Sequence, residues 1–184
     1  LKQITWDSLQ DVNGHRQVIF EAIVKYRKMK NRGVVAIFQR DRFDRYSNFA
    51  RIGEGSLGGK GRGLAFIDNM VKHHAEFEEF ENATVAIPKT VVLCTDIFDE
   101  FMDSNNLYQI ALSDVDDDVI LKAFLRARLP ERLMDDFLTF LDVVRSPIAI
   151  RSSSLLEDSH YQPFAGIYST YMIPFLEDKN EMLR

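Results

Sequence analysis

A glycine-rich segment with a single lysine at its centre is the part of this sequence best suited to bind phosphate. Six of the nine glycines fall within residues 53–63, which read GEGSLGGKGRG, and Lys60 is the only lysine in that segment. Clustered glycines leave backbone N–H groups open to an anion, and a lysine adds a positive charge. The segment therefore predicts a phosphate contact, and a purely structural glycine hinge is the alternative.

The glycine spacing matches two known phosphate-binding motifs only in part. Gly53, Gly55 and Gly58 match the GxGxxG pattern of dinucleotide-binding folds, which also requires a buried strand just before it. Residues 46–52 are half polar, and the acidic residues further along the chain lie in a helical pattern instead of at a strand end. A P-loop needs a serine or threonine directly after its lysine, and Gly61 stands there. Neither motif is predicted.

A second group of side chains suited to phosphate follows a short apolar run, residues 147–150. Arg151 comes at the end of this run, which predicts a buried strand, and Ser152 and two further serines come next. The planar guanidinium group of an arginine can bind two phosphate oxygens at once, and hydroxyl or backbone donors can assist it. The alternative is a surface ion pair of Arg151 with Glu157 or Asp158.

The elements that must position these two groups are indicated by hydrophobic periodicity and turn residues. Helices are expected at residues 8–32, 64–80, 97–104 and, broken at Pro130, 119–144; strands are expected at residues 34–38, 83–93, 147–150 and 164–173. The helix from residue 64 starts directly after the glycines, so its N-terminal N–H groups would face them. Thr95 or Asp96 would cap the next helix, and residues 39–45 would form a linker or a solvated turn.

The composition excludes several classes of function. The net charge is −5 with a pI near 5.4, and no basic run combines with aromatic residues, so we expect no nucleic-acid partner. No apolar stretch reaches the roughly 20 residues that cross a bilayer, and Cys94 is the only cysteine, so we expect a cytoplasmic protein without membrane contact. A cluster of four aspartates predicts a helix start instead of a metal site, because acidic residues stabilise that end of the helix dipole. These are Asp114, Asp116, Asp117 and Asp118.

Three stretches, in order along the chain, resemble one protein family. Residues 57–67, LGGKGRGLAFI, and the later stretches IAIRSSSLLEDS and FAGIYSTYMIP are similar to the N-terminal ATP-binding domain of phosphoenolpyruvate synthase and pyruvate phosphate dikinase. The intervening IPKTVVLCTDIFDEFM also resembles this family, and the similarity spans residues 52–174. The resemblance implies an ATP-grasp domain. In that family, ATP phosphorylates a histidine on a separate swivelling domain, which carries the phosphoryl group to pyruvate on a third domain.

The resemblance also implies which residues bind the nucleotide. Lys60 and Arg151 match the family's phosphate-contacting lysine and arginine, and Gly166 and Thr170 match residues close to the nucleotide. The candidate ATP-binding residues are therefore Gly58, Gly59, Lys60, Gly61, Arg151, Ser152, Gly166 and Thr170. Three residues depart from the family's usual RSSATAED and FAGQ: Leu155, Leu156 and Ile167. The Mg²⁺ ligands are expected outside this chain, no catalytic residue is assigned within it, and no phosphohistidine motif surrounds its four histidines.

These observations predict an α+β fold: the first and incomplete part of an ATP-grasp-like domain, with a mixed sheet, flanking helices and a helical insertion. Residues 1–45 would form a helical extension or linker, and residues 46–184 the nucleotide-binding domain. Because the chain opens with Leu1 and ends at Arg184 in a charged run, we expect further domains, including phosphohistidine and pyruvate or phosphoenolpyruvate domains. Two functions stay open. One is part of a phosphotransferase that is inactive by itself, and the other is a non-catalytic nucleotide-sensing or scaffold domain of a signalling protein.

Overall fold

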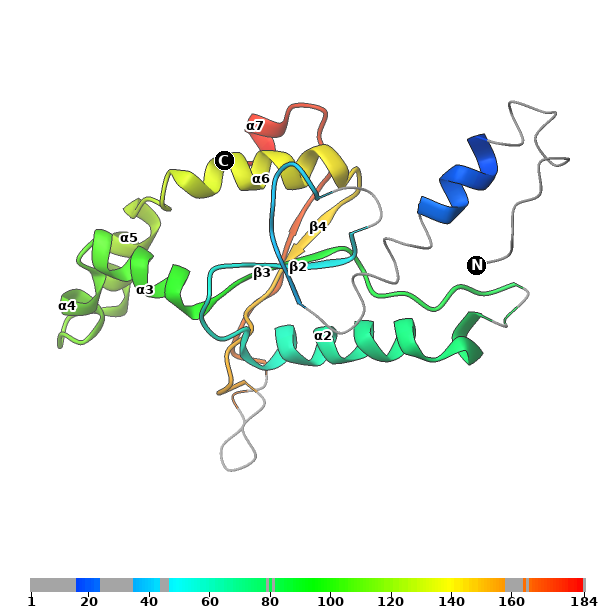
Figure 1. The fold of residues 1–184 in the computed structure, drawn as a ribbon. Coiled ribbons are helices and arrows are strands. Elements are labelled where there is room, and N and C mark those ends of the chain that lie inside the picture. Colours follow the sequence, from blue (N-terminus) through cyan, green and yellow to red (C-terminus); the bar gives the residue numbers. More distant parts are fainter. Residues whose placement is uncertain are drawn as a thin grey trace, which may run out of the picture.

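The computed structural model describes residues 16–23, 35–43, 47–78, 80, 82–157, 164 and 166–183, and combines helices with two small sheets (Figure 1). The predicted α+β class is confirmed. Residues 16–23 form a helix. The later elements are β1 (Ala36–Ile37), β2 (Phe49–Ile52), α2 (Gly58–His73), the 3-10 helix η2 (Ala75–Glu78), β3 (Thr90–Leu93), α3 (Thr95–Ser104), α4 (Leu107–Ala111), α5 (Asp117–Arg126), α6 (Arg132–Val143), β4 (Ile148–Ile150), β5 (Tyr171–Ile173) and α7 (Lys179–Met182).

The first sheet is parallel, with β2 in the middle of the order β1-β2-β3. This is a correction, because the half-polar residues 46–52 were not expected to contain a buried strand. Phe49, Ala50 and Ile52 are all buried, and the polar Arg51 directs its guanidinium group to the carbonyl of Gly53 and to the carboxylate beyond it. Its charge is thus paired at the strand end, so the strand can be buried on both faces.

Helices cover both faces of this sheet (Figure 1). On one face, Phe49 and Val92 pack with Leu64 of α2. On the other face, Ile52 packs with Leu133 of α6, which is fully buried. Burial on two sides is the usual state of a parallel sheet, whose strands must be joined by crossover connections. The crossover from β2 to β3 contains the glycine-rich segment and α2.

The second sheet is an antiparallel pair, with Ile148 of β4 opposite Ile173 of β5 and Ile150 opposite Tyr171. The strand predicted at residues 147–150 is confirmed, but its expected burial is wrong, since the side chain of Ile150 is 51% exposed. Among the described residues this pair is separate from the parallel sheet, so the single mixed sheet of the prediction is replaced by one parallel and one antiparallel sheet.

The segment before β2 is packed against α6. The helix predicted at residues 8–32 is present at residues 16–23, and its other parts lie outside the described residues. Within the predicted linker, Phe43 is buried beside the ring of Phe140, 5.8 Å away, and Arg40 donates hydrogen bonds to two aspartates of α6. Residues 40–42 form an exposed turn, as expected, and Phe43 at its end is buried against α6. The division of the chain at residue 45 remains a prediction.

The helices between β3 and β4 form the helical insertion. The stretch predicted at 119–144 is divided into α5 and α6, and the carbonyl of Pro130 accepts the N–H of Leu133 just as α6 begins. Acidic residues occupy the first turn of α5, as the helix dipole favours. Among the described helices, none combines the length and apolarity that crossing a membrane requires.

Candidate functional site

The first turn of α2 is made of the glycine-rich segment itself. The helix begins at Gly58, six residues before the predicted start, so Lys60 lies in a helical turn instead of a preceding loop. Glycine disfavours helix by about 1 kcal/mol per residue relative to alanine, which is why the sequence pattern placed the helix later. Tertiary contacts at this end of α2 override that preference.

Gly58 is required by the close approach of another segment. Its φ is +72°, in the left-handed region, and a Cβ built on it would lie 1.7 Å from the carbonyl oxygen of Ser153. At Gly61 the corresponding Cβ would lie 3.2 Å from atoms of Leu57 and Val92, so this position is tight as well. The absence of side chains here lets residues 151–154 lie directly on the start of α2.

Ser153 joins the two segments through three hydrogen bonds. Its carbonyl accepts the N–H of Gly59 at 2.9 Å, and its hydroxyl accepts the N–H of Gly61 at 2.8 Å. The same hydroxyl donates to the carbonyl of Leu57 at 2.6 Å. Ser153 thus satisfies two of the N–H groups that a helix N-terminus leaves unpaired. The sequence did not single out Ser153 among its serine neighbours, because the bonds depend on a contact between segments about 90 residues apart.

Lys60 forms an ion pair with Glu157, which follows the serine segment, residues 152–154, in the sequence. Their side chains are 22% and 14% exposed, and the atoms in contact, Nζ and Oε2, are both buried. Beyond this contact, neither atom has a hydrogen-bond partner among the described residues. An ammonium group can donate three hydrogen bonds. Lys60 therefore fits an anionic ligand such as phosphate, and the present anion is the Glu157 carboxylate.

Arg151 lies at the exposed end of β4, with no ion pair to another described residue. Glu157 pairs with Lys60 instead of Arg151, and Asp158, the other candidate partner, lies outside the described residues. Because Ile150 is opposite Tyr171, Arg151 and Thr170 extend from neighbouring strand ends. Figure 1 shows the loop after β4, in orange, beside the first turn of α2.

The FAG segment, residues 164–174, contacts the end of the serine segment. The N–H of Phe164 donates to the carbonyl of Leu156 at 3.4 Å, and the hydroxyl of Tyr168 lies 3.5 Å from that of Ser154. Gly166 has a φ of +83° and is exposed. The structure thus brings the glycine segment, the serine segment and the FAG segment together at one end of α2. Ser152 accepts a hydrogen bond from the N–H of Ser154 and helps to shape this loop.

The first half of the glycine-rich segment is held by α3. The carboxylate of Asp96 accepts the N–H groups of Glu54 and Gly55, both at 2.9 Å, and Thr95 accepts that of Ser56 at 3.0 Å. These two side chains were expected to cap α3, but they bind the loop and provide no side-chain cap. Hydrogen bonds from the N–H of Glu54, and then of Gly55, lower the pKa of Asp96.

Gly53 and Gly55 lie directly against the side chains of Asp96 and Thr95. A Cβ on Gly53 would lie 2.4 Å from the Asp96 carboxylate, and one on Gly55 would lie 2.5 Å from the Thr95 hydroxyl. Hydrogen bonds to Asp96 and Thr95 hold the loop in place at residues 54–56, so these residues do not act as a free hinge. Lys60 lies in the second half of the segment, which begins at Gly58.

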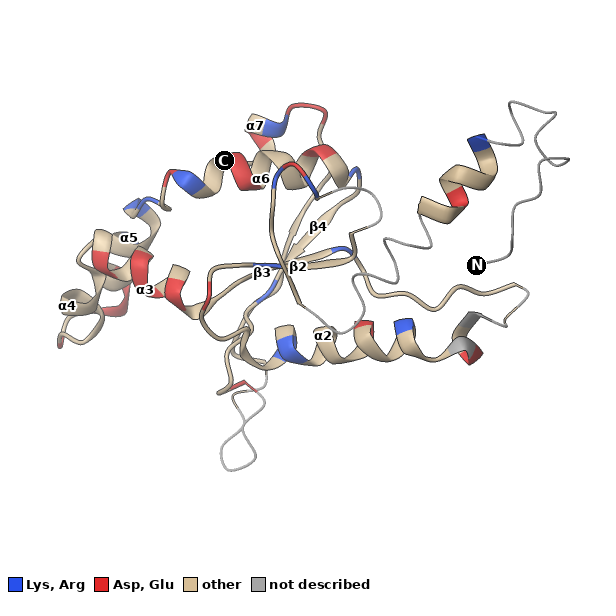
Figure 2. Cartoon of the chain, viewed as in Figure 1, with Lys and Arg blue, Asp and Glu red and all other residues tan. Residues whose placement is uncertain are grey.

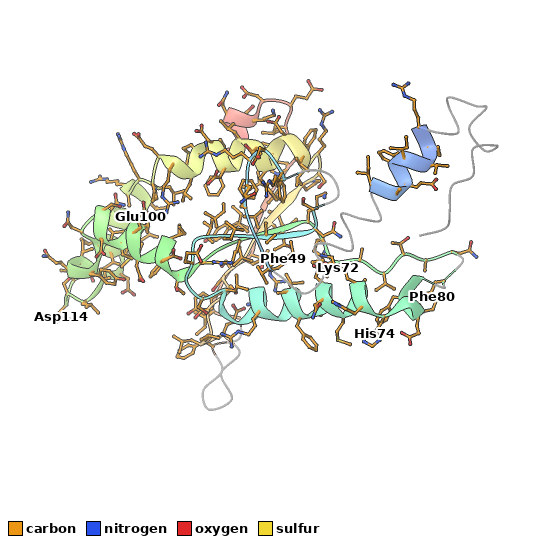
Figure 3. All side chains as sticks on the ribbon, viewed as in Figure 1. Phe49, Lys72, His74, Phe80, Glu100 and Asp114 are labelled. Carbon is orange, nitrogen blue, oxygen red and sulfur yellow. The ribbon has the colours of Figure 1, made fainter. Side chains whose placement is uncertain are left out.

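The described residues contain no group of three or more His, Cys, Asp or Glu side chains that could hold a metal ion. Acidic residues are frequent on α3 and α5 (Figure 2), and two carboxylates, those of Asp96 and Glu157, contact the glycine-rich segment. Lys72 and His74 lie at the opposite end of α2 (Figure 3), where they pair with Asp68 and Glu76. The expected absence of Mg²⁺ ligands within this chain therefore remains a prediction, and Asp158 lies outside the described residues.

One known protein family matches most of the chain. The family model described as pyruvate phosphate dikinase, AMP/ATP-binding domain, matches residues 54–184. The match includes the glycine, serine and FAG segments and confirms the resemblance seen in the sequence. Comparisons with curated proteins and with solved structures found no match. The chain belongs to the pyruvate phosphate dikinase AMP/ATP-binding domain family.

Proposed function

We propose that this chain positions the phosphates of ATP in a phosphotransferase that resembles phosphoenolpyruvate synthase and pyruvate phosphate dikinase. The phosphoryl group would pass to a histidine on another domain, and pyruvate or phosphoenolpyruvate would bind to a further domain. One observation carries the proposal: the Lys60 ammonium lies at the first turn of α2, between the segments that the family match includes, and its one partner among the described residues is a carboxylate.

Each residue of the proposed site is assigned a role in binding ATP that its position supports. Lys60 and Arg151 would place positive charge on the phosphate oxygens, which is the main demand of phosphoryl transfer on a protein. Gly58, Gly59 and Gly61 would let the serine segment approach, so that the two cations lie on adjoining segments. Ser152, Gly166 and Thr170 would line the nucleotide. Their positions on that loop and at the neighbouring strand ends support this.

Mg²⁺ is assigned no ligand among the described residues. ATP would bring the ion on its own phosphates, and the residues that hold it in the family's domain would come from outside this chain. The cytoplasm, where a thiol such as that of Cys94 stays reduced, is the compartment that we propose.

A second function, nucleotide sensing or scaffolding without catalysis, is favoured by a separate observation. Leu155, Leu156 and Ile167 replace residues of the family's usual motifs, and all three side chains are more than half exposed. A changed nucleotide-facing loop can bind a nucleotide without supporting transfer. Consumption of ATP by the parent protein would distinguish transfer from sensing, because a sensor binds ATP and leaves it intact.

The test is the thermal stabilisation of the chain by MgATP. We compare the unchanged chain with Lys60→Met and Arg151→Ala, and with Lys122→Met and Arg145→Ala as exposed controls that make the same charge changes elsewhere. A charged hydrogen bond contributes about 1.5–3 kcal/mol, so each site variant should bind MgATP roughly 10- to 100-fold more weakly. The controls should behave like the unchanged chain. Equal shifts in all five proteins would remove Lys60 and Arg151 from the nucleotide site.

A further inference from the structure

The glycine-rich segment contacts two carboxylates of its own chain. Asp96 accepts two backbone N–H groups in the first half of the segment, and Glu157 pairs with Lys60 in the second half. Carboxylates of the protein therefore occupy two places on this segment where an external anion could bind. The two carboxylates differ in how they are held, and this difference decides which of them a ligand can displace.

Asp96 is fixed in place. Both of its oxygens accept hydrogen bonds of 2.9 Å, from Glu54 and Gly55, and a lowered pKa keeps the group ionised. Removing this carboxylate would leave two loop N–H groups unpaired. Asp96 is thus part of the framework of the loop.

Glu157 has Lys60 as its one partner, among the described residues, at the oxygen that meets the ammonium group. Beyond this contact, neither Oε2 of Glu157 nor Nζ of Lys60 has a hydrogen-bond partner among those residues. Burying two charges costs desolvation energy, and their attraction offsets this cost only in part when further hydrogen bonds are missing. A triphosphate carries several negative charges against the single charge of a carboxylate. Phosphate oxygens can therefore replace the Glu157 carboxylate as the partner of the Lys60 ammonium group.

We propose that Glu157 is an internal competitor for phosphate, so that nucleotide binding exchanges the Glu157 carboxylate for a phosphate on Lys60. This inference rests on the proposed function, because it takes Lys60 as a phosphate-binding residue. The exchange needs Glu157 to withdraw, since the Lys60 side chain is only 22% exposed and Glu157 covers the buried ammonium. Glu157 thus lowers the affinity for nucleotide and keeps the lysine charge paired when no nucleotide is bound.

If Glu157 competes with phosphate, removing its charge should raise the affinity for nucleotide. Glu157→Gln keeps the size of the side chain and removes its charge, so MgATP should bind about tenfold more tightly, equivalent to about 1.4 kcal/mol. Inorganic tripolyphosphate should show the same gain, because the competition concerns phosphate and not the nucleoside. Glu177→Gln is the matched control, since it makes the same change at an exposed glutamate.

The experiment is a titration of MgATP and of tripolyphosphate into the 184-residue chain and its variants, with folding checked by circular dichroism. The gain from Glu157→Gln should vanish in the background of Lys60→Met, because the two residues act through one contact. Unchanged or weaker binding by Glu157→Gln would overturn the inference and make Glu157 a residue that orients the lysine. If Glu157→Gln does not fold, Glu157→Asp carries the same test, with a gain expected and no gain refuting it. Equal binding by Lys60→Met and the unchanged chain would instead refute the proposed function.

Discussion

Replacing Gly58 with alanine tests the contact that assembles the site. The left-handed φ of Gly58 disfavours any residue with a Cβ by roughly 1–2 kcal/mol. The new methyl group would also lie 1.7 Å from the Ser153 carbonyl oxygen, and ordinary contacts begin at 3.4 Å. The obstacle is backbone, which cannot rotate away like a side chain, so the serine segment must move off α2.

The cost follows from what that movement breaks. Three hydrogen bonds connect Ser153 with Leu57, Gly59 and Gly61, and each contributes about 0.5–1.5 kcal/mol. Together with the backbone term, Gly58→Ala should lower the free energy of unfolding by about 2.5–6.5 kcal/mol. For a chain of this length that corresponds to a fall in Tm of roughly 5–26 °C.

Gly63 is the matched control in the same helix. Nothing lies within 4 Å of the Cβ that alanine would add there, so Gly63→Ala should stabilise the chain by about 0.5–1 kcal/mol through helix propensity. Urea and thermal unfolding, followed by circular dichroism, measure both variants. A Gly58→Ala variant within 1 kcal/mol of the unchanged chain, or a Gly63→Ala variant that is equally destabilised, would refute the packing of the serine segment on α2.

Two further predictions concern single side chains around the same segment. Ser153→Ala should lower the free energy of unfolding by about 2–3 kcal/mol, because it leaves the N–H of Gly61 unpaired. Ser152→Ala removes one local hydrogen bond and should lower the free energy of unfolding by at most about 1 kcal/mol. Equal losses of stability in the two variants would contradict this. The pKa of Asp96 is lowered on folding, so its stabilising contribution is fully present above its ordinary value of 3.8 and is lost as pH falls through the lower folded value. Urea midpoints below pH 4 should therefore fall less in Asp96→Asn than in the unchanged chain, and parallel curves would argue against the Asp96 contacts.

Much of the fold follows from local pattern. The helices α3, α5 and α6 and the strand β4 lie where hydrophobic periodicity and turn residues predict them. The strand β2 was missed because Ser47, Asn48 and Arg51 make residues 46–52 half polar. Arg51 is tolerated in the strand because its guanidinium group contacts Gly53 and Glu54 just beyond it, and the burial of the strand comes from the helices packed on both faces. The start of α2 was placed too late because glycine disfavours helices, and only the serine segment that packs on Gly58 explains the earlier start.

The family and the two residue types that can bind phosphate follow from the order of the motifs and the charges of Lys60 and Arg151, which are properties of the chain alone. The contacts that these residues make depend on the fold. Glu157 lies about 100 residues from Lys60 in sequence and pairs with it through contact between segments. Ser153, and not a neighbouring serine, joins the glycines for the same reason. Hydrogen bonds and ion pairs depend on distances of a few ångströms, and spacing along a sequence does not fix such distances across a fold.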